Sequence, residues 1–140
     1  MFLLLWTLNI KKKPEIFHSV NQPKKDALIR FEKEAIKFGK AGDDREILLS
    51  FVTDPYQAIE SDLNITRQAI KILIENNVRF TILTKGGIRA AGDFDLLTNY
   101  NRASFGTTIC FTKQDVADKW EPNAATIDMR IAAIKPREAF

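Results

Sequence analysis

An alternation between short apolar runs and longer segments with helical spacing constrains the fold of this chain most strongly. Three apolar runs occupy about residues 46–52, 79–84 and 104–111, and each of them ends at polar residues. Between these runs, apolar residues recur every three or four positions, which is typical of amphipathic helices. Strands that alternate with helices pair in parallel through crossover connections, so the sequence predicts an α/β fold.

The same spacing predicts where the helices lie. Segments with one apolar face cover residues 23–38, 64–76, 93–100, 112–119 and 124–135. We expect Gly39 and Gly42 to mark the end of the first helix, since glycine commonly follows a helix. Asn64 or Thr66 is expected to cap the second helix.

The number of strand–helix units limits the architecture. A complete (β/α)8 barrel takes about 250 residues, whereas this chain has 140. The residues themselves leave open a fragment of a barrel, a sheet that a partner completes, and a small open sheet to which Met1–Ile10 adds a strand. Of these we predict an α/β protein that forms a partial (β/α) barrel of about three to four parallel strands with crossover helices, which is the fold implied by the family resemblance given below. Residues 1–22 are predicted to be an irregular or replaced N-terminal segment, and residues 23–140 the core of the partial barrel.

Composition and charge argue against several classes of protein. The formal net charge of +3, from 21 basic and 18 acidic residues, is too small to support nucleic-acid binding. The apolar start, Met1–Trp6, is too short to span a bilayer and precedes its basic residues, so we predict neither a membrane span nor a signal peptide. Cys110 is the one cysteine, which favours a reducing, cytoplasmic location. Its apolar neighbours predict that it is buried in the third strand.

Polar residues at the ends of the three strands are the candidate ligand site. Thr53 and Asp54 follow the first strand, Lys85 follows the second with two glycines behind it, and Thr107 lies in the third. Ligands of α/β proteins bind beyond the carboxyl ends of the strands. We therefore expect one site built from several loops.

A structural role competes with ligand binding at each of these positions. An aspartate before proline commonly opens a turn, which is the favoured interpretation of Asp54. A solvated lysine in a flexible glycine turn is the favoured interpretation of Lys85, while packing and ribose binding are equally supported for Thr107. Glu121 is expected to cap the helix that follows it. The sequence contains no catalytic triad and no metal-ligand spacing, so we predict neither catalytic nor metal-binding residues.

Four sequence blocks occur in an order and spacing typical of a known family. They are Leu48–Gln57 with its Asp-Pro-Tyr-Gln motif, Ile82–Lys85, Phe105–Thr108 and Trp120–Ala124 with its Trp-Glu-Pro motif. Together they resemble the spore photoproduct lyase-like branch of the radical SAM superfamily, over about residues 24–134. The resemblance implies a radical SAM (β/α) barrel core over residues 23–140. It also implies a [4Fe–4S] cluster and S-adenosylmethionine at the carboxyl ends of the strands, whose reductive cleavage gives a 5′-deoxyadenosyl radical.

The resemblance further implies a role for each site residue. Thr53 and Asp54 would hold the amino group of the methionine moiety, Lys85 would pair with its carboxylate, and Thr107 would contact the ribose. The family's cluster motif, Cys-x3-Cys-x2-Cys, is absent, because Cys110 is solitary. We therefore interpret the chain as an internal fragment of a radical SAM enzyme that is inactive alone, and whether the chain itself is an enzyme is left open.

Two alternatives to a radical SAM fragment stay open. One is a small α/β module that binds phosphate or a nucleotide through Lys85–Gly87. The other is a non-catalytic, vestigial protein that completes its sheet by self-association through open strand edges. The main interpretation predicts a small-molecule cofactor as the partner and leaves the substrate unassigned.

Overall fold

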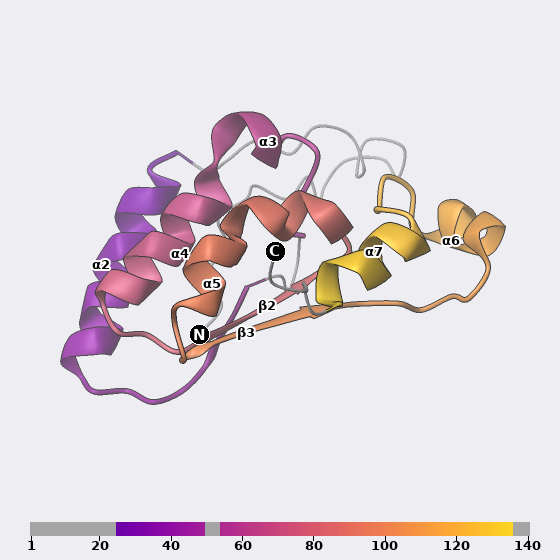
Figure 1. Cartoon of the computed structure of the whole chain (residues 1–140). Helices are drawn as coiled ribbons and strands as arrows, with labels where there is room; N and C mark the ends of the chain where they lie inside the picture. The colour runs from indigo at the N-terminus through magenta and orange to yellow at the C-terminus, as the bar shows by residue number, and fades with distance from the viewer. Residues whose placement is uncertain (1–24, 50–53, 136–140) are drawn as a thin grey trace.

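A parallel sheet covered by helices forms the described part of the molecule. A computed structural model describes residues 25–49 and 54–135. Within these ranges three strands form the sheet, and helices lie along one side of it (Figure 1). The predicted N-terminal segment 1–22, the end of the first predicted strand and the predicted site residue Thr53 lie outside the described residues.

The elements follow one another in the predicted alternating order. The strands are β1 (Ile47–Leu49), β2 (Phe80–Thr84) and β3 (Ala103–Thr107). The helices are α2 (Ala27–Lys40), α3 (Glu60–Leu63), α4 (Ile65–Glu75), α5 (Phe94–Thr98), α6 (Gln114–Trp120) and α7 (Ile127–Ile134), with a 3₁₀-helix, η1 (Gly87–Asp93), between β2 and α5.

The three strands lie in the order β1-β2-β3, and both neighbouring pairs are parallel. The register aligns Leu49 with Ile82 and Thr84 with Thr107. Helices fill both connections, as parallel neighbours require. The predicted α/β class with parallel strands and crossover helices is therefore confirmed, whereas the partial barrel stays a prediction.

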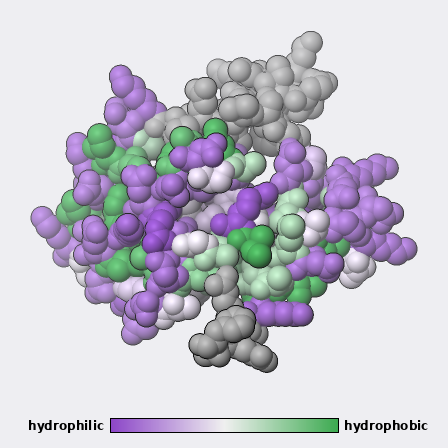
Figure 2. All heavy atoms as spheres, turned by 45° about the horizontal axis from the view of Figure 1, so that its top comes forward, coloured by the Kyte–Doolittle hydropathy of each residue, from purple (hydrophilic) through white to green (hydrophobic). Residues whose placement is uncertain are grey.

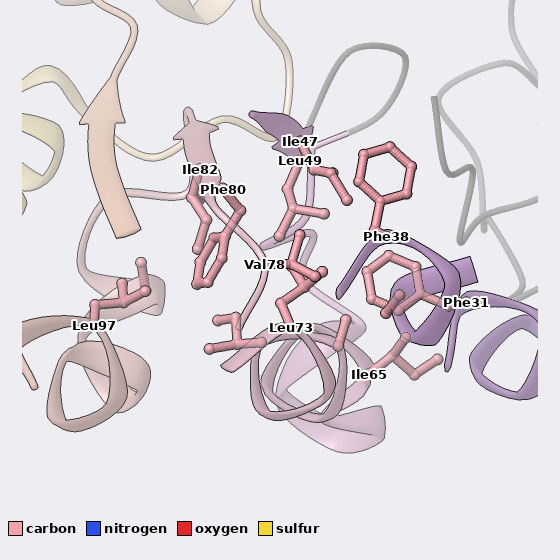
Figure 3. Close-up of a cluster of buried hydrophobic side chains, with 14 of the residues drawn as sticks. Phe31, Phe38, Ile47, Leu49, Ile65, Leu73, Val78, Phe80, Ile82 and Leu97 are labelled. Atoms are coloured by element: carbon pink, nitrogen blue, oxygen red, sulfur yellow. The ribbon is translucent and has the colours of Figure 1, made fainter. Parts of the chain in front are cut away.

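The hydrophobic core lies between the sheet and its helices (Figure 3). Phe80 and Ile82 in β2 are fully buried, and the neighbouring Leu83 is partly exposed. This alternation is expected for a strand that has helices packed against one of its two faces. Burial of each large apolar side chain stabilises the fold by roughly 1.5–3 kcal/mol. The buried core residues labelled in Figure 3 are Phe31, Phe38, Ile47, Leu49, Ile65, Leu73, Val78, Phe80, Ile82 and Leu97.

The outer surface of the helical side is mainly hydrophilic. Figure 2, which tilts the top of Figure 1 toward the viewer, shows charged and polar side chains interrupted by separate apolar ones. Dispersed apolar side chains of this kind are normal on protein surfaces. No helix within residues 25–49 and 54–135 is both long and apolar enough to cross a membrane.

The third strand is shorter than predicted. It ends at Thr107, and Cys110 is exposed rather than buried in the strand. The reason lies in its neighbour, because β2 ends at Thr84, which is the register partner of Thr107. The last bond between the two chains runs from the Thr108 N–H to the Thr84 carbonyl (3.2 Å). The apolar residues that follow Thr108 have no described strand with which to pair.

The ends of two helices also differ from the prediction. Gly39 lies inside α2, and Gly42, with a φ of 61°, follows the helix. Asn64 precedes α4 but makes no side-chain capping bond. The Thr66 N–H instead donates to Glu60 Oε1 (2.5 Å), so a carboxylate six residues upstream takes the capping role.

Candidate ligand site at the carboxyl edge of the sheet

The structure brings three of the four predicted site residues together around the end of β2. The Lys85 N–H donates to Asp54 Oδ2 (2.5 Å), and the Thr84 hydroxyl donates to Asp54 Oδ1 (2.6 Å). On the other side, the Thr107 hydroxyl donates to the Thr84 carbonyl (2.8 Å). Residues that follow β1 and β2 and the last residue of β3 therefore meet at one edge, as parallel strands allow. The fourth residue, Thr53, is not described.

Asp54 opens a turn, as its favoured interpretation predicts. The Tyr56 N–H donates to Asp54 Oδ1 (2.8 Å), which is the pattern of an aspartate that caps the turn after it. Oδ1 thus accepts two hydrogen bonds and Oδ2 accepts one among the described residues. A carboxylate oxygen has two lone pairs, so Oδ2 retains one acceptor position for a ligand.

Lys85 reaches a carboxylate of the protein itself. Its Nζ lies 3.1 Å from Glu121 Oε1, and its side chain is 39% exposed. The prediction that Glu121 caps the next helix is wrong, because the Thr126 hydroxyl accepts from the Met129 N–H and caps α7. Glu121 is nearly buried, so its charge is stabilised by its two cationic neighbours rather than by water.

The second cation is Arg130, which the sequence reasoning missed. Its side chain is buried, and its Nη1 donates to Glu121 Oε2 (2.6 Å) and to the Thr108 carbonyl (3.1 Å). Its Nε donates to the Ala125 carbonyl (2.7 Å). An arginine within a largely apolar helical segment, nine residues after a glutamate, was the available signal. Arginine is almost never fully buried unless it is paired, so its burial implies such a partner.

The electrostatics of this cluster keep Glu121 ionised. Burial alone would raise the pKa of its carboxyl group, but the hydrogen bonds from Arg130 and Lys85 outweigh burial and hold the pKa below its ordinary value. Lys85, Glu121 and Arg130 therefore form a continuous chain of two cations and one anion beside the Asp54 carboxylate.

The glycine turn after Lys85 is closely packed, which contradicts the expectation of a flexible turn. A Cβ on Gly86 would lie 2.6 Å from the Tyr56 Cβ, and the Gly86 N–H donates to the Thr84 hydroxyl (2.7 Å). Gly87 has a φ of 57°, a conformation that favours glycine, and a Cβ there would lie 2.8 Å from the Ala125 Cβ. The turn thus lets η1 and α7 approach each other closely.

A second polar cluster holds the turn that contains Tyr56 in place. The Tyr56 hydroxyl donates to Asp93 Oδ2 (2.9 Å), and Arg67 pairs with Asp93 and Asp95. Burial, followed by the charge of Asp93, raises the pKa of Tyr56, so its hydroxyl stays protonated and donates. This cluster is a structural support for the edge rather than a part of it.

The described residues do not form a metal centre. Within residues 25–49 and 54–135, no group of three or more His, Cys, Asp or Glu side chains could hold a metal ion. A [4Fe–4S] cluster needs several thiolates, and the chain contains one cysteine, Cys110, which is exposed. The residues of this chain therefore do not fit the cluster.

The fold and the site define an α/β protein with a charged cluster at the carboxyl edge of a parallel sheet. No model of a known protein family matches the chain, and no solved structure matches it. The chain is similar to Uncharacterized protein MJ0683 of Methanocaldococcus jannaschii, with 31% identity over 90 residues. The match covers 64% of this chain and 34% of the relative, so the chain spans about a third of the length of this curated relative.

Proposed function

We propose that the chain is a fragment of a radical SAM enzyme and that the carboxyl edge of its sheet binds S-adenosylmethionine. The observation that carries the proposal is the hydrogen bond from the backbone N–H of Lys85 to Asp54, which places an acidic and a basic residue side by side at one edge of the sheet. The methionine moiety of the cofactor carries one ammonium and one carboxylate group. An edge with one acidic and one basic group complements both charges.

Each residue contributes a specific contact in this proposal. Asp54 Oδ2 accepts a hydrogen bond from the ammonium group, and Lys85 Nζ pairs with the carboxylate. Because the Thr107 hydroxyl donates its proton to the Thr84 carbonyl, it serves the ribose as an acceptor. Thr53 keeps its proposed role beside Asp54.

Binding without catalysis is what we propose for this chain. The bound cofactor would supply a radical only after reduction by an iron–sulfur cluster, and the residues present do not fit that cluster. We therefore assign this chain no catalytic step. The proposed setting is cytoplasmic, and the proposed partner is the small-molecule cofactor.

The hydrogen bonds of the glycine turn weigh against a phosphate site at Lys85–Gly87. A phosphate loop offers free backbone N–H groups to the ligand. Here the N–H groups of Lys85 and Gly86 already donate to Asp54 and Thr84. A zwitterionic ligand needs neither of these amides, so it suits the edge better.

Isothermal titration of the full chain with S-adenosylmethionine tests this proposal. Asp54→Asn keeps the shape and the turn-capping oxygen but removes the charge, so we expect binding to weaken by about tenfold or more. Lys85→Gln should weaken it similarly. Lys119→Gln on the exposed surface of α6 is the matched control and should bind as the parent does.

Failure of the parent chain to bind S-adenosylmethionine would reject the proposal. Binding that is unchanged in both site variants would also reject it, because the ligand would then lie elsewhere. Circular dichroism of each variant should show that the fold is retained. Asp54→Ala is a poorer choice, since it removes the turn-capping bond from Tyr56 and both hydrogen bonds from the end of β2.

A further inference from the structure

Lys85, Glu121 and Arg130 form a chain of charges with one buried end and one exposed end. Arg130 is the buried end, 1% exposed, and three of its hydrogen bonds go to Ala125, Thr108 and Glu121. Lys85 is the exposed end. Since Glu121 binds one cation with each carboxylate oxygen, it connects the buried end to the exposed one.

The sum of these charges is +1, because two cations face one carboxylate. The excess charge emerges at Lys85 Nζ, since the guanidinium of Arg130 is enclosed by protein acceptors. An ammonium group has three N–H donors, and Glu121 accepts from one of them. The remaining donors of Lys85 are available to a ligand anion.

We propose that Glu121 is a positioning residue that sets the ligand selectivity of this edge, favouring a carboxylate over a phosphate. By neutralising one of the two cations, it leaves a single positive charge, which one carboxylate balances. A phosphate group carries about −1.5 to −2 at neutral pH. That larger charge would face the carboxylates of both Glu121 and Asp54. The inference rests on the proposed function, because it concerns the same site.

Removal of the Glu121 charge should therefore move two affinities in opposite directions. Glu121→Gln raises the sum of the cluster from +1 to +2 and releases Lys85 from its fixed position. We expect the affinity for S-adenosylmethionine to fall by about tenfold and the affinity for adenosine diphosphate to rise. Both ligands carry an adenosyl group but differ in their charged groups, so the readout is the change in the ratio of their affinities between the parent chain and Glu121→Gln.

The controls separate positioning from stability. If the role of Glu121 were purely structural, Glu121→Gln would weaken the binding of both ligands by the same factor. The reason is that a smaller fraction of the chain would be folded and able to bind either of them. Glu121→Asp keeps the charge and should retain the selectivity of the parent chain. Asp115→Asn, on the exposed surface of α6, raises the net charge equally without touching the cluster and should leave the affinity ratio unchanged.

The outcomes distinguish this inference from the proposed function. If the parent chain does not bind S-adenosylmethionine, the proposed function fails and the inference fails with it. If the parent binds it and Glu121→Gln leaves the ratio of the two affinities unchanged, only the inference is overturned. A change in that ratio that Asp115→Asn reproduces would also overturn it, because net charge alone would then explain the effect.

Discussion

At the scale of single residues, Glu60 is a buried acidic side chain with one unsatisfied oxygen among the described residues. It is 7% exposed, and its Oε1 accepts from the Thr66 N–H. Its Oε2 is buried without a hydrogen-bond partner among the described residues. Burial is the main cause that raises the pKa of Glu60, from an ordinary value of 4.5 to about 7. A carboxyl group that stays protonated in the folded state avoids most of the cost of this position.

This raised pKa predicts a loss of stability at higher pH. Between pH 4.5 and pH 7 the folded state keeps a proton that the unfolded state releases, so the contribution of Glu60 is full below about 4.5 and disappears as the pH passes 7. The effect is at most about 3–4 kcal/mol, since one pKa unit corresponds to about 1.4 kcal/mol. Glu60→Gln should remove this part of the pH dependence, as measured by urea unfolding at pH 5 and pH 8.

Glu75→Gln, on the exposed surface of α4, is the matched control and should keep the pH dependence of the parent chain. If Glu60→Gln instead unfolds with the same difference between the two pH values as the parent, Glu60 is ionised throughout this range. The buried carboxyl group would then be stabilised by neighbours other than a proton.

At the scale of the elements, α2 lies closely against the end of α4 at Gly39. A Cβ at this position would collide with the carbonyl oxygen of Asn76, which ends α4. The Asn76 side chain donates to the Ile72 carbonyl (2.8 Å), so this end of α4 is held in place by its own capping bond. The contact therefore depends on the absence of a side chain at Gly39.

Gly39→Ala should lower the free energy of unfolding by about 1–3 kcal/mol, because overpacking outweighs the roughly 1 kcal/mol that alanine gains in a helix. Gly92→Ala is the control, since no neighbouring atom lies within 4 Å of the added Cβ. Thermal unfolding should show a lower Tm for the first variant and an unchanged or higher Tm for the second. A Gly39→Ala chain as stable as the parent would mean that α2 moves away from Asn76 at no cost.

The elements also show which parts of the fold a sequence encodes locally. The second strand was predicted at about 79–84 and observed at Phe80–Thr84, because its apolar alternation and its flanking turns are local signals. The predicted end of β3 was wrong, because the end of this strand depends on where β2 ends. The short helices α3 and η1 were not predicted, since neither Glu60–Leu63 nor Gly87–Asp93 shows apolar residues at a clear helical spacing.

At the scale of the whole molecule, the meeting of Asp54, Lys85 and Thr107 was predictable and the charge chain behind them was not. Parallel strands place their carboxyl ends at one edge, so the order of the strands is enough to bring polar ends together. The pairing of Glu121 with Arg130 depends on how α6 and α7 fold back toward the sheet. That arrangement leaves no periodic pattern in the sequence.

Because the chain contains a single cysteine, we can predict how much iron–sulfur cluster it binds. After anaerobic reconstitution with iron and sulfide and subsequent desalting, we expect far less than one [4Fe–4S] cluster per chain, since cluster ligation needs several thiolates. Iron analysis measures this directly, and Cys110→Ser should retain the same background amount. Stoichiometric iron that disappears in Cys110→Ser would instead mean that several copies of the chain share a cluster.

The Thr84 carbonyl accepts hydrogen bonds from both the Thr107 hydroxyl and the Thr108 N–H. These bonds have a consequence for ligand binding. Because Thr84 also donates to Asp54, hydrogen bonds hold Asp54, Thr84 and Thr107 relative to one another. Binding then costs little conformational entropy, which is the advantage of a preorganised receptor. Hydrogen exchange at the Thr108 amide should accordingly be slow in the free protein and should change little when the ligand is added.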